Sequence, residues 1–129
     1  MGNPIESHRY AVLVVEDDPF LLLEAMDLAE DAGFVVYGAG NADRALEHLE
    51  RHPEIRVLFT DVAMPGSMDG LTLARAVRHR WPPVAIMVTS GKIDVSQKDM
   101  PENGVFFSKP YPPATIIQAL NDIAGKIAA

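Results

Sequence analysis

Acidic, basic and hydroxyl residues follow several short apolar runs of this chain, and their types indicate phosphate and metal chemistry. The residues at the ends of the first, third, fourth and fifth runs are Glu16 and Asp17, Asp61, Thr89, and Lys109. Carboxylates held close together repel strongly unless a cation lies among them, and oxygen ligands without sulfur suit Mg²⁺. A lysine and a hydroxyl near the same point can hold phosphate oxygens. If folding gathers these residues, the simplest single account is a Mg²⁺-assisted phosphoryl site with Asp61 as the acceptor.

The apolar runs themselves predict strands, because they are too short for helices and are rich in β-branched and aromatic residues. The five runs are Tyr10–Val15, Phe34–Tyr37, Val57–Phe59, Val84–Val88 and Val105–Phe107. They lack the polar alternation of a half-exposed strand. Such runs are typical of strands that are buried on both faces of a parallel sheet.

Apolar stripes at helical spacing lie between the runs and predict helices. Their members are Leu22, Met26 and Ala29; Ala42, Ala45, Leu46 and Leu49; Leu73, Val77 and Trp81; and Ile116, Leu120, Ile123 and Ile127. Caps are predicted at Asp18, Asn41 and Asp69, the first of these followed by proline at the first turn. Between the fourth and fifth runs the pattern is weak. There Asp94–Met100 predicts at most a short helix, since Pro101 ends it.

Alternating strands and helices predict βαβ units with right-handed crossovers. The expected fold is therefore α/β, with a five-stranded, doubly wound parallel sheet. Ligands of such sheets bind outside the carboxyl ends of the strands. This is the edge where the polar residues that follow the runs would meet.

Composition excludes several classes of function. The chain has 129 residues, a common size for one domain, and its net charge of −7 disfavours binding to nucleic acid. It contains no cysteine, which excludes disulfides and thiolate metal sites and fits a cytoplasmic location. No apolar run approaches the length of a membrane helix. Residues 1–9 are interpreted as a flexible lead rather than a signal peptide, and residues 10–127 as the domain.

Four segments give the chain a close resemblance to the receiver domains of two-component response regulators. They read VLVVEDDP (12–19), LFTDVAMPGSMDG (58–70), MVTSG (87–91) and FFSKPY (106–111). They occur in the family's order and spacing, and the resemblance covers about residues 10–127, nearly the whole chain. It implies a (βα)5, flavodoxin-like fold of the chemotaxis type and a role in phosphorelay signal transduction. The protein would then be a phosphoacceptor with only Mg²⁺-dependent self-phosphorylation and autodephosphorylation.

The resemblance also implies a role for each matching residue. Asp61 would be the phosphorylated residue, and Thr89 and Lys109 would contact the phosphoryl oxygens. Asp17 would bind Mg²⁺ directly and Glu16 through water. The remaining implied features are the backbone carbonyl of Ala63 as a further metal ligand, Phe106 as an aromatic switch residue that moves with Thr89, and a cis Lys109–Pro110 bond.

Two departures from the family concern loops. The loop PGSMDG is one residue longer than in many relatives, and the segment after Gly91 is short, so the fourth helix is expected to be reduced or mobile. Relatives signal through the fourth helix, fifth strand and fifth helix. Here that face would consist of residues 94–100, Val105–Phe107 and the last helix.

The expected partners are a sensor histidine kinase or a histidine phosphotransfer protein, together with an unknown downstream protein. Neither nucleic acid nor membrane is expected as a partner, no DNA-binding output domain follows in this chain, and a monomer or weak homodimer is expected. The alternatives are a phosphatase or phosphotransferase with an aspartyl-phosphate intermediate, a flavodoxin-like cofactor binder, a pseudo-receiver that only binds partners, and a fragment of a larger hybrid protein. His48 and His52 have a spacing that can bind metal, but two solvated histidines are favoured.

Overall fold

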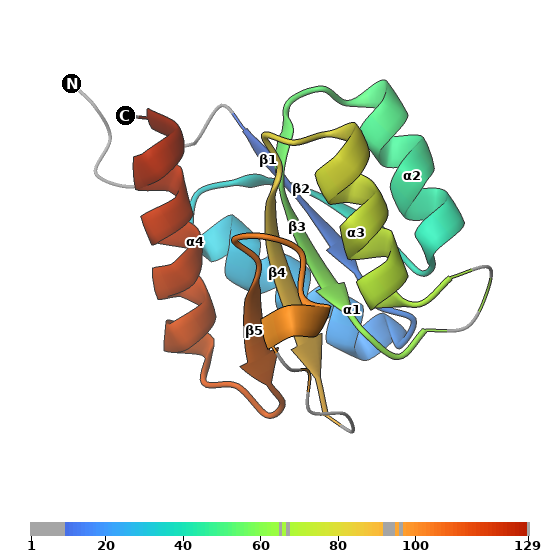
Figure 1. Cartoon of the computed structure of the whole chain (residues 1–129). Helices are drawn as coiled ribbons and strands as arrows, with labels where there is room; N and C mark the ends of the chain where they lie inside the picture. The colour runs from blue at the N-terminus through green and yellow to red at the C-terminus, as the bar shows by residue number, and fades with distance from the viewer. Residues whose placement is uncertain (1–9, 65, 67, 92–94, 96, 129) are drawn as a thin grey trace.

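The fold is a single parallel sheet between two layers of helices (Figure 1). A computed structural model describes residues 10–64, 66, 68–91, 95 and 97–128. The strands are β1 (Ala11–Val15), β2 (Val35–Ala39), β3 (Ile55–Asp61), β4 (Ala85–Ser90) and β5 (Val105–Ser108). The helices are α1 (Pro19–Asp31), α2 (Ala42–Arg51), α3 (Gly70–Arg80) and α4 (Pro113–Ala128), with a 3-10 turn η1 (Gln97–Asp99). The predicted α/β class and five-stranded parallel sheet are confirmed.

The order of the strands creates a site for ligands. All neighbours pair in parallel in the order β2-β1-β3-β4-β5. The chain therefore leaves β1 in one direction along the sheet and returns to continue in the other. The crevice outside the carboxyl ends of β1 and β3 is the topological switch point, where open α/β sheets bind ligands.

Two apolar clusters hold the layers together. One lies between the sheet and α1 and α4, and includes Val14, Phe59 and Ile116. The other lies between the sheet and α2 and α3, and includes Leu58 and Leu73. All five residues of β1 are buried, as the continuous apolar run predicts for a central strand.

The strand boundaries differ from the apolar runs, because backbone pairing extends past them. β3 was predicted as Val57–Phe59 but runs from Ile55 to Asp61, since β1 pairs with its first residue and β4 pairs with its last. β2 is displaced toward Ala39, because Gly33, with φ 92°, turns the chain just before it. The phosphoacceptor candidate Asp61 is thus the last residue of a strand rather than part of a loop.

The three predicted N-caps are confirmed. Asp18 accepts hydrogen bonds from the amides of Phe20 and Leu21 at 2.9 and 3.2 Å. Asn41 and Asp69 each accept one from the third residue of their helices, both at 2.9 Å. Asp18 and Asp69 start α1 and α3 beside the switch-point crevice.

The connection between β4 and β5 contains no α-helix among its described residues. Of the predicted segment 94–100, residues 94 and 96 lie outside the described residues, and the turn η1 is the regular structure that the rest forms. Arg75 of α3 donates to the carbonyl oxygen of Asp99 at 3.0 Å, and Arg78 donates to that of Glu102 at 3.1 Å. Two guanidinium groups therefore attach this connection to α3. The lead at residues 1–9 lies outside the described residues.

Candidate functional site

Three carboxylates meet at the carboxyl ends of β1 and β3. Glu16, Asp17 and Asp61 each offer one oxygen, and these oxygens all lie within 4.8 Å of one another. Glu16 and Asp61 are buried, with exposed fractions of 6% and 7%, whereas Asp17 is exposed. Two buried carboxylates this close to a third create strong negative potential, which a cation would relieve.

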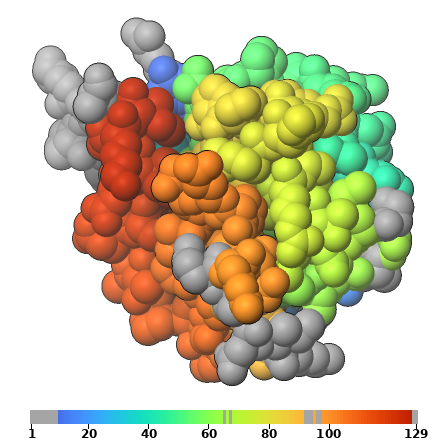
Figure 2. All heavy atoms as spheres, viewed as in Figure 1, coloured from blue at the N-terminus to red at the C-terminus, as the bar shows by residue number. Residues whose placement is uncertain are grey.

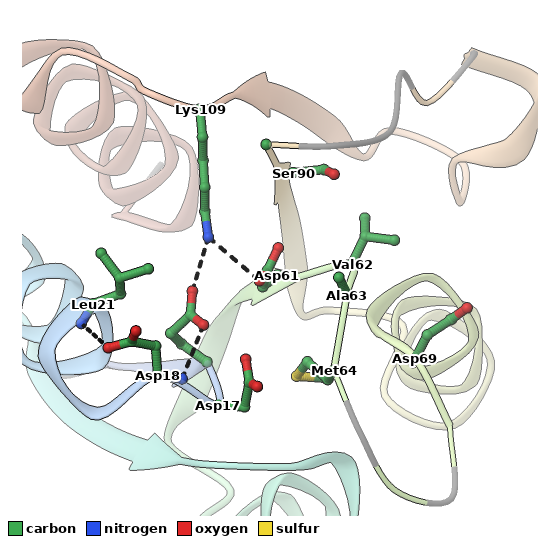
Figure 3. A pocket seen from close by; sticks show the side chains of 12 residues that line it. Asp17, Asp18, Leu21, Asp61, Val62, Ala63, Met64, Asp69, Ser90 and Lys109 are labelled. Carbon is green, nitrogen blue, oxygen red and sulfur yellow. Dashed lines mark hydrogen bonds and ion pairs between the residues drawn. The ribbon is translucent and has the colours of Figure 1, made fainter.

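Lys109 already provides part of that compensation. Its Nζ lies 2.9 Å from Oε1 of Glu16 and 3.3 Å from Oδ2 of Asp61 (Figure 3). Oε2 of Glu16 accepts a further hydrogen bond, from the amide of Asp18 at 3.1 Å. Lys109 therefore links the end of β5 to the ends of β1 and β3, and Glu16 is held at both oxygens.

The protonation behaviour of the pair reflects burial and pairing together. Burial raises the pKa of Glu16 above 4.5, and the hydrogen bond from Lys109 only partly opposes this. Burial by itself would lower the pKa of Lys109, but the hydrogen bond to Glu16 and the charges of Asp61 and Glu16 raise it above 10.5. Lys109 therefore remains a cation at the site throughout the physiological range.

Thr89 carries a buried hydroxyl next to the carboxylates. It pairs with Asp61 in the β3–β4 ladder, so the two side chains lie on the same face of the sheet. Its Oγ1 is inaccessible to solvent and has no hydrogen-bond partner among the described residues. Buried hydroxyls are nearly always paired, so a group that brings an oxygen to Asp61 would satisfy it.

The carboxylates line an open pocket of about 720 Å³. Five of its lining residues are acidic and one, Lys109, is basic. Ala63 and Ser90 form parts of the rim, and Leu21 and Met64 supply apolar wall, as Figure 3 shows. The donor set of carboxylate and carbonyl oxygens, without sulfur or imidazole, fits Mg²⁺.

Close packing of α3 against β3 fixes the position of Asp61. The amide of Gly70 donates to the carbonyl oxygen of Val62 at 2.9 Å. A Cβ atom on Gly70 would overlap the carbonyl oxygen of Asp61, so only glycine permits this approach. The hydroxyl of Thr60 donates to the same carbonyl oxygen at 3.0 Å. The loop at Pro65 and Ser67 lies outside the described residues.

The structure brings together most residues that the sequence singled out. Glu16, Asp17, Asp61 and Lys109 meet, Ala63 lines the same pocket, and Lys109–Pro110 is a cis peptide bond. Phe106 lies away from the pocket: it pairs with Val88 and packs in the cluster under α2 and α3. The apolar walls Leu21 and Met64 were not predicted as site residues, because apolar residues carry no chemical signal in a sequence.

The expectation of two solvated histidines is wrong. His48 and His52 are half-buried, and the ring of His52 stacks on that of Tyr37, with centroids 4.1 Å apart and planes 18° apart. Nε2 of His48 lies 3.1 Å from the carbonyl oxygen of Gly38. The histidines were misassigned because nothing local in the sequence shows that α2 lies over β2. They attach the C-terminal end of α2 to this edge strand, and neither of them lines the acidic pocket.

Comparison with known proteins agrees with this geometry. The family model of the response regulator receiver domain matches residues 12–121. Chemotaxis protein CheY of Thermotoga maritima is 27% identical over 121 residues, covering 88% of this chain and 96% of that protein. The transcriptional regulatory protein BaeR of Escherichia coli O6:H1 is 28% identical over 123 residues, covering 93% of this chain but 50% of that protein. The chain thus spans about half the length of BaeR.

Solved structures show the same fold. A response regulator receiver protein from Sinorhizobium medicae superposes with a TM-score of 0.82 at 26% identity, covering 90% of this chain and 94% of that one. One from Pseudomonas putida gives 0.79 at 28% identity, covering 90% and 98%. None of the described helices is long and apolar enough to cross a bilayer.

Proposed function

Because this chain belongs to the response regulator receiver domain family of two-component signalling, we propose that Asp61 is its phosphoacceptor and that Mg²⁺ binds beside it. The observation that carries the proposal is the meeting of Glu16, Asp17 and Asp61 within 4.8 Å, with Lys109 in contact with two of them. Glu16 and Asp17, with Asp61 and the carbonyl oxygen of Ala63, would hold the ion. When bound, Mg²⁺ neutralises charge on the transferring phosphoryl group.

The residues of the chain have distinct roles in the proposed transfer. A carboxylate oxygen of Asp61 attacks the phosphorus of a phosphohistidine, forming a P–O bond as the donor's P–N bond breaks. The leaving imidazole keeps the electron pair and takes up a proton. Lys109 would pair with the phosphoryl oxygens, and the hydroxyl of Thr89, which has no partner among the described residues, would donate to one of them.

Intact mass after incubation with acetyl phosphate and Mg²⁺ tests the proposal. The wild type should gain one phosphoryl group, only when Mg²⁺ is present. Asp61→Asn should gain none. Asp69→Asn is the matched control, because Asp69 lines the same pocket but its carboxylate caps α3. Full labelling of Asp61→Asn would refute the assignment.

The partner that supplies the phosphoryl group should contact α1. Phe20, Leu21 and Leu23 lie on its first turns with 79%, 40% and 60% of their surface exposed, and Leu21 also lines the pocket. A protein that brings a phosphohistidine to Asp61 must cover this apolar surface. We therefore assign it to a sensor histidine kinase or histidine phosphotransfer protein.

This assignment separates protein donors from small-molecule donors. Phe20→Ser should slow transfer from a histidine kinase or phosphotransfer protein while leaving labelling by acetyl phosphate unchanged. Val35→Ser, at an exposed valine on β2, is the control and should affect neither. Equal loss with both donors would show that Phe20 supports the site itself instead of a docking surface.

We assign the contact with a downstream protein to the side of β4 that faces β5, away from β3 and Asp61. Phosphorylation would draw Thr89 toward the phosphoryl group, and Phe106 would move into the space that Thr89 leaves. This is a shift between two conformational populations, biased by new contacts at Asp61. The affected surface comprises η1, β5 and α4, whose orange and red atoms adjoin on the face that Figure 2 shows.

A further inference from the structure

A second hollow lies at the opposite end of the sheet from the acidic pocket. Its volume is about 680 Å³, close to that of the acidic pocket. It is bounded by the first residues of β3, β4 and β5 and by the last turns of α3 and α4. In Figure 1 these elements meet at the top of the view, near the C-terminus of α4.

The charge of this hollow is the reverse of the charge of the chain. Arg56, Arg78 and Lys126 line it, and no carboxylate does among the described residues. None of the three cations forms an ion pair with a described residue. The whole chain has 18 acidic residues against 11 lysines and arginines, so three cations around one hollow without a counter-charge focus positive potential there.

Two of the cations are held in place by neutral partners. Arg78 donates from Nη1 to the carbonyl oxygens of Pro82 and Val84 at 2.7 and 3.1 Å, and from Nε to that of Glu102. Its Nη2 donates to no described residue. The guanidinium carbon of Arg56 lies 4.8 Å from the centre of the Tyr10 ring. These contacts fix the side chains without neutralising them, which leaves charge and donors for a ligand.

A role in helix stability explains only part of this arrangement. Cations in the last turn of a helix interact favourably with its dipole, which suits Arg78 in α3 and Lys126 in α4. Arg56 lies on β3, so interaction with the dipole of a helix of its own cannot account for its position. The helix dipole also does not explain why no carboxylate of a described residue lines the hollow.

The rest of the lining is apolar. Val105 is 47% exposed, and Ile123 and Ile127 are half-buried. We propose that this hollow binds a small organic anion whose acidic group, a carboxylate or a phosphate ester, lies among the three cations. Its apolar or aromatic body would pack against the valine and isoleucines. The volume is in the range of small-molecule sites, and the proposal is independent of phosphorylation at Asp61.

Amide NMR titrations of the full chain without Mg²⁺ test the site with three probes. Phenyl phosphate and phenylacetate share an aromatic body and differ in their acid group, and benzyl alcohol is the neutral control. Saturable shifts are expected at the starts of β4 and β5 and in the last turn of α4, with at least one of the anions and weakly or not at all with the alcohol. Which anion binds more tightly identifies the ligand as a phosphate ester or a carboxylate.

Charge variants test whether the cations of the hollow are responsible for binding the anionic probes. Arg56→Gln and Lys126→Gln should each weaken it by about tenfold, the effect of losing one charged hydrogen bond. Arg78 is left intact, because its loss would also release three carbonyl groups. Lys98→Gln removes the same charge at an exposed site outside the hollow and should not change the affinity. Shifts that do not saturate, equal binding of benzyl alcohol, or unchanged affinity in both hollow variants would overturn the proposal.

Discussion

The site depends on individual charges that are partly removed from water. Glu16 and Asp61 are more than nine-tenths buried, and Lys109 contacts both. Without the lysine, two buried carboxylates would lack a fixed counter-charge, and leaving a buried charge unpaired is strongly destabilising. Lys109 therefore supplies the fixed counter-charge of the apo site, in addition to its proposed contact with a phosphoryl group.

The switch role proposed for Phe106 predicts a difference between neighbouring rings. Phe106 packs under α2 and α3, whereas Phe107 packs on the other face of the sheet. When Mg²⁺ and beryllofluoride are added to imitate phosphorylation, the ring resonances of Phe106 should shift strongly and those of Phe107 much less. Aromatic NMR spectra measure both rings in one sample. Equal or absent shifts at Phe106 would contradict a switch through this residue.

A second prediction at this scale concerns pH and the contact between β2 and the turn that joins α2 to β3. The hydroxyl of Tyr37 donates to Oε2 of Glu54 at 2.7 Å, and this bond lowers the pKa of Glu54 below 4.5. Since the folded pKa is depressed, the stabilisation is present above pH 4.5 and is lost as the pH falls through the folded pKa.

Tyr37→Phe keeps the ring that stacks on His52 but removes this hydrogen bond. The difference in unfolding free energy between wild type and variant should therefore be positive near pH 6 and shrink toward zero below pH 4.5. Urea unfolding at several pH values measures it. A difference that does not change with pH would show that Glu54 is not the partner that matters.

At the scale of the elements, the sequence predicted helices and strands correctly where the pattern that identifies them is local. Continuous apolar runs identified the five strands, and Asp18, Asn41 and Asp69 identified the starts of three helices. The true ends of β3 could not be predicted, because its pairing with β1 and β4 is non-local. The site was predictable because parallel strands place their carboxyl ends together. The apolar pocket walls and the contact of His52 with Tyr37 depend on tertiary packing that no pattern records.

The packing of α3 on β3 gives a prediction for Gly70, with Gly125 of α4 as the control. Gly70→Ala should destabilise the fold by about 1–3 kcal/mol, the usual cost of overpacking, because its Cβ would meet the carbonyl group of Asp61. It should also slow phosphorylation, since Asp61 must move. Gly125→Ala, in α4 with nothing within 4 Å of the added atom, is the control and should stabilise by about 0.5–1 kcal/mol. Denaturant unfolding of both variants checks the pair; a tolerated Gly70→Ala would disprove the tight approach.

At the scale of the whole molecule, the two ends of the sheet carry opposite charge. Five acidic residues line the pocket at the carboxyl ends of the strands, and three cations line the hollow at the amino ends. Since five carboxylates and one lysine line the acidic pocket, this end of the sheet should attract divalent cations.

Binding of Mg²⁺ at this end should raise the stability of the entire domain. At a concentration of one hundred times its Kd, a ligand of the folded state adds about 2.7 kcal/mol to the unfolding free energy. Thermal unfolding should therefore shift upward with MgCl₂ but not with NaCl of equal ionic strength. Asp17→Asn should lose the Mg²⁺-dependent shift. An equal shift in that variant would place the ion elsewhere.

The central claim is that Asp61 itself carries the phosphoryl group, and mapping the modified residue tests it most directly. The wild-type protein is incubated with acetyl phosphate and Mg²⁺, and borohydride then reduces any aspartyl phosphate to homoserine, which peptide mass spectrometry locates. The account predicts homoserine at position 61 and at no other aspartate. Homoserine at Asp17, Asp18 or Asp69 instead would contradict it.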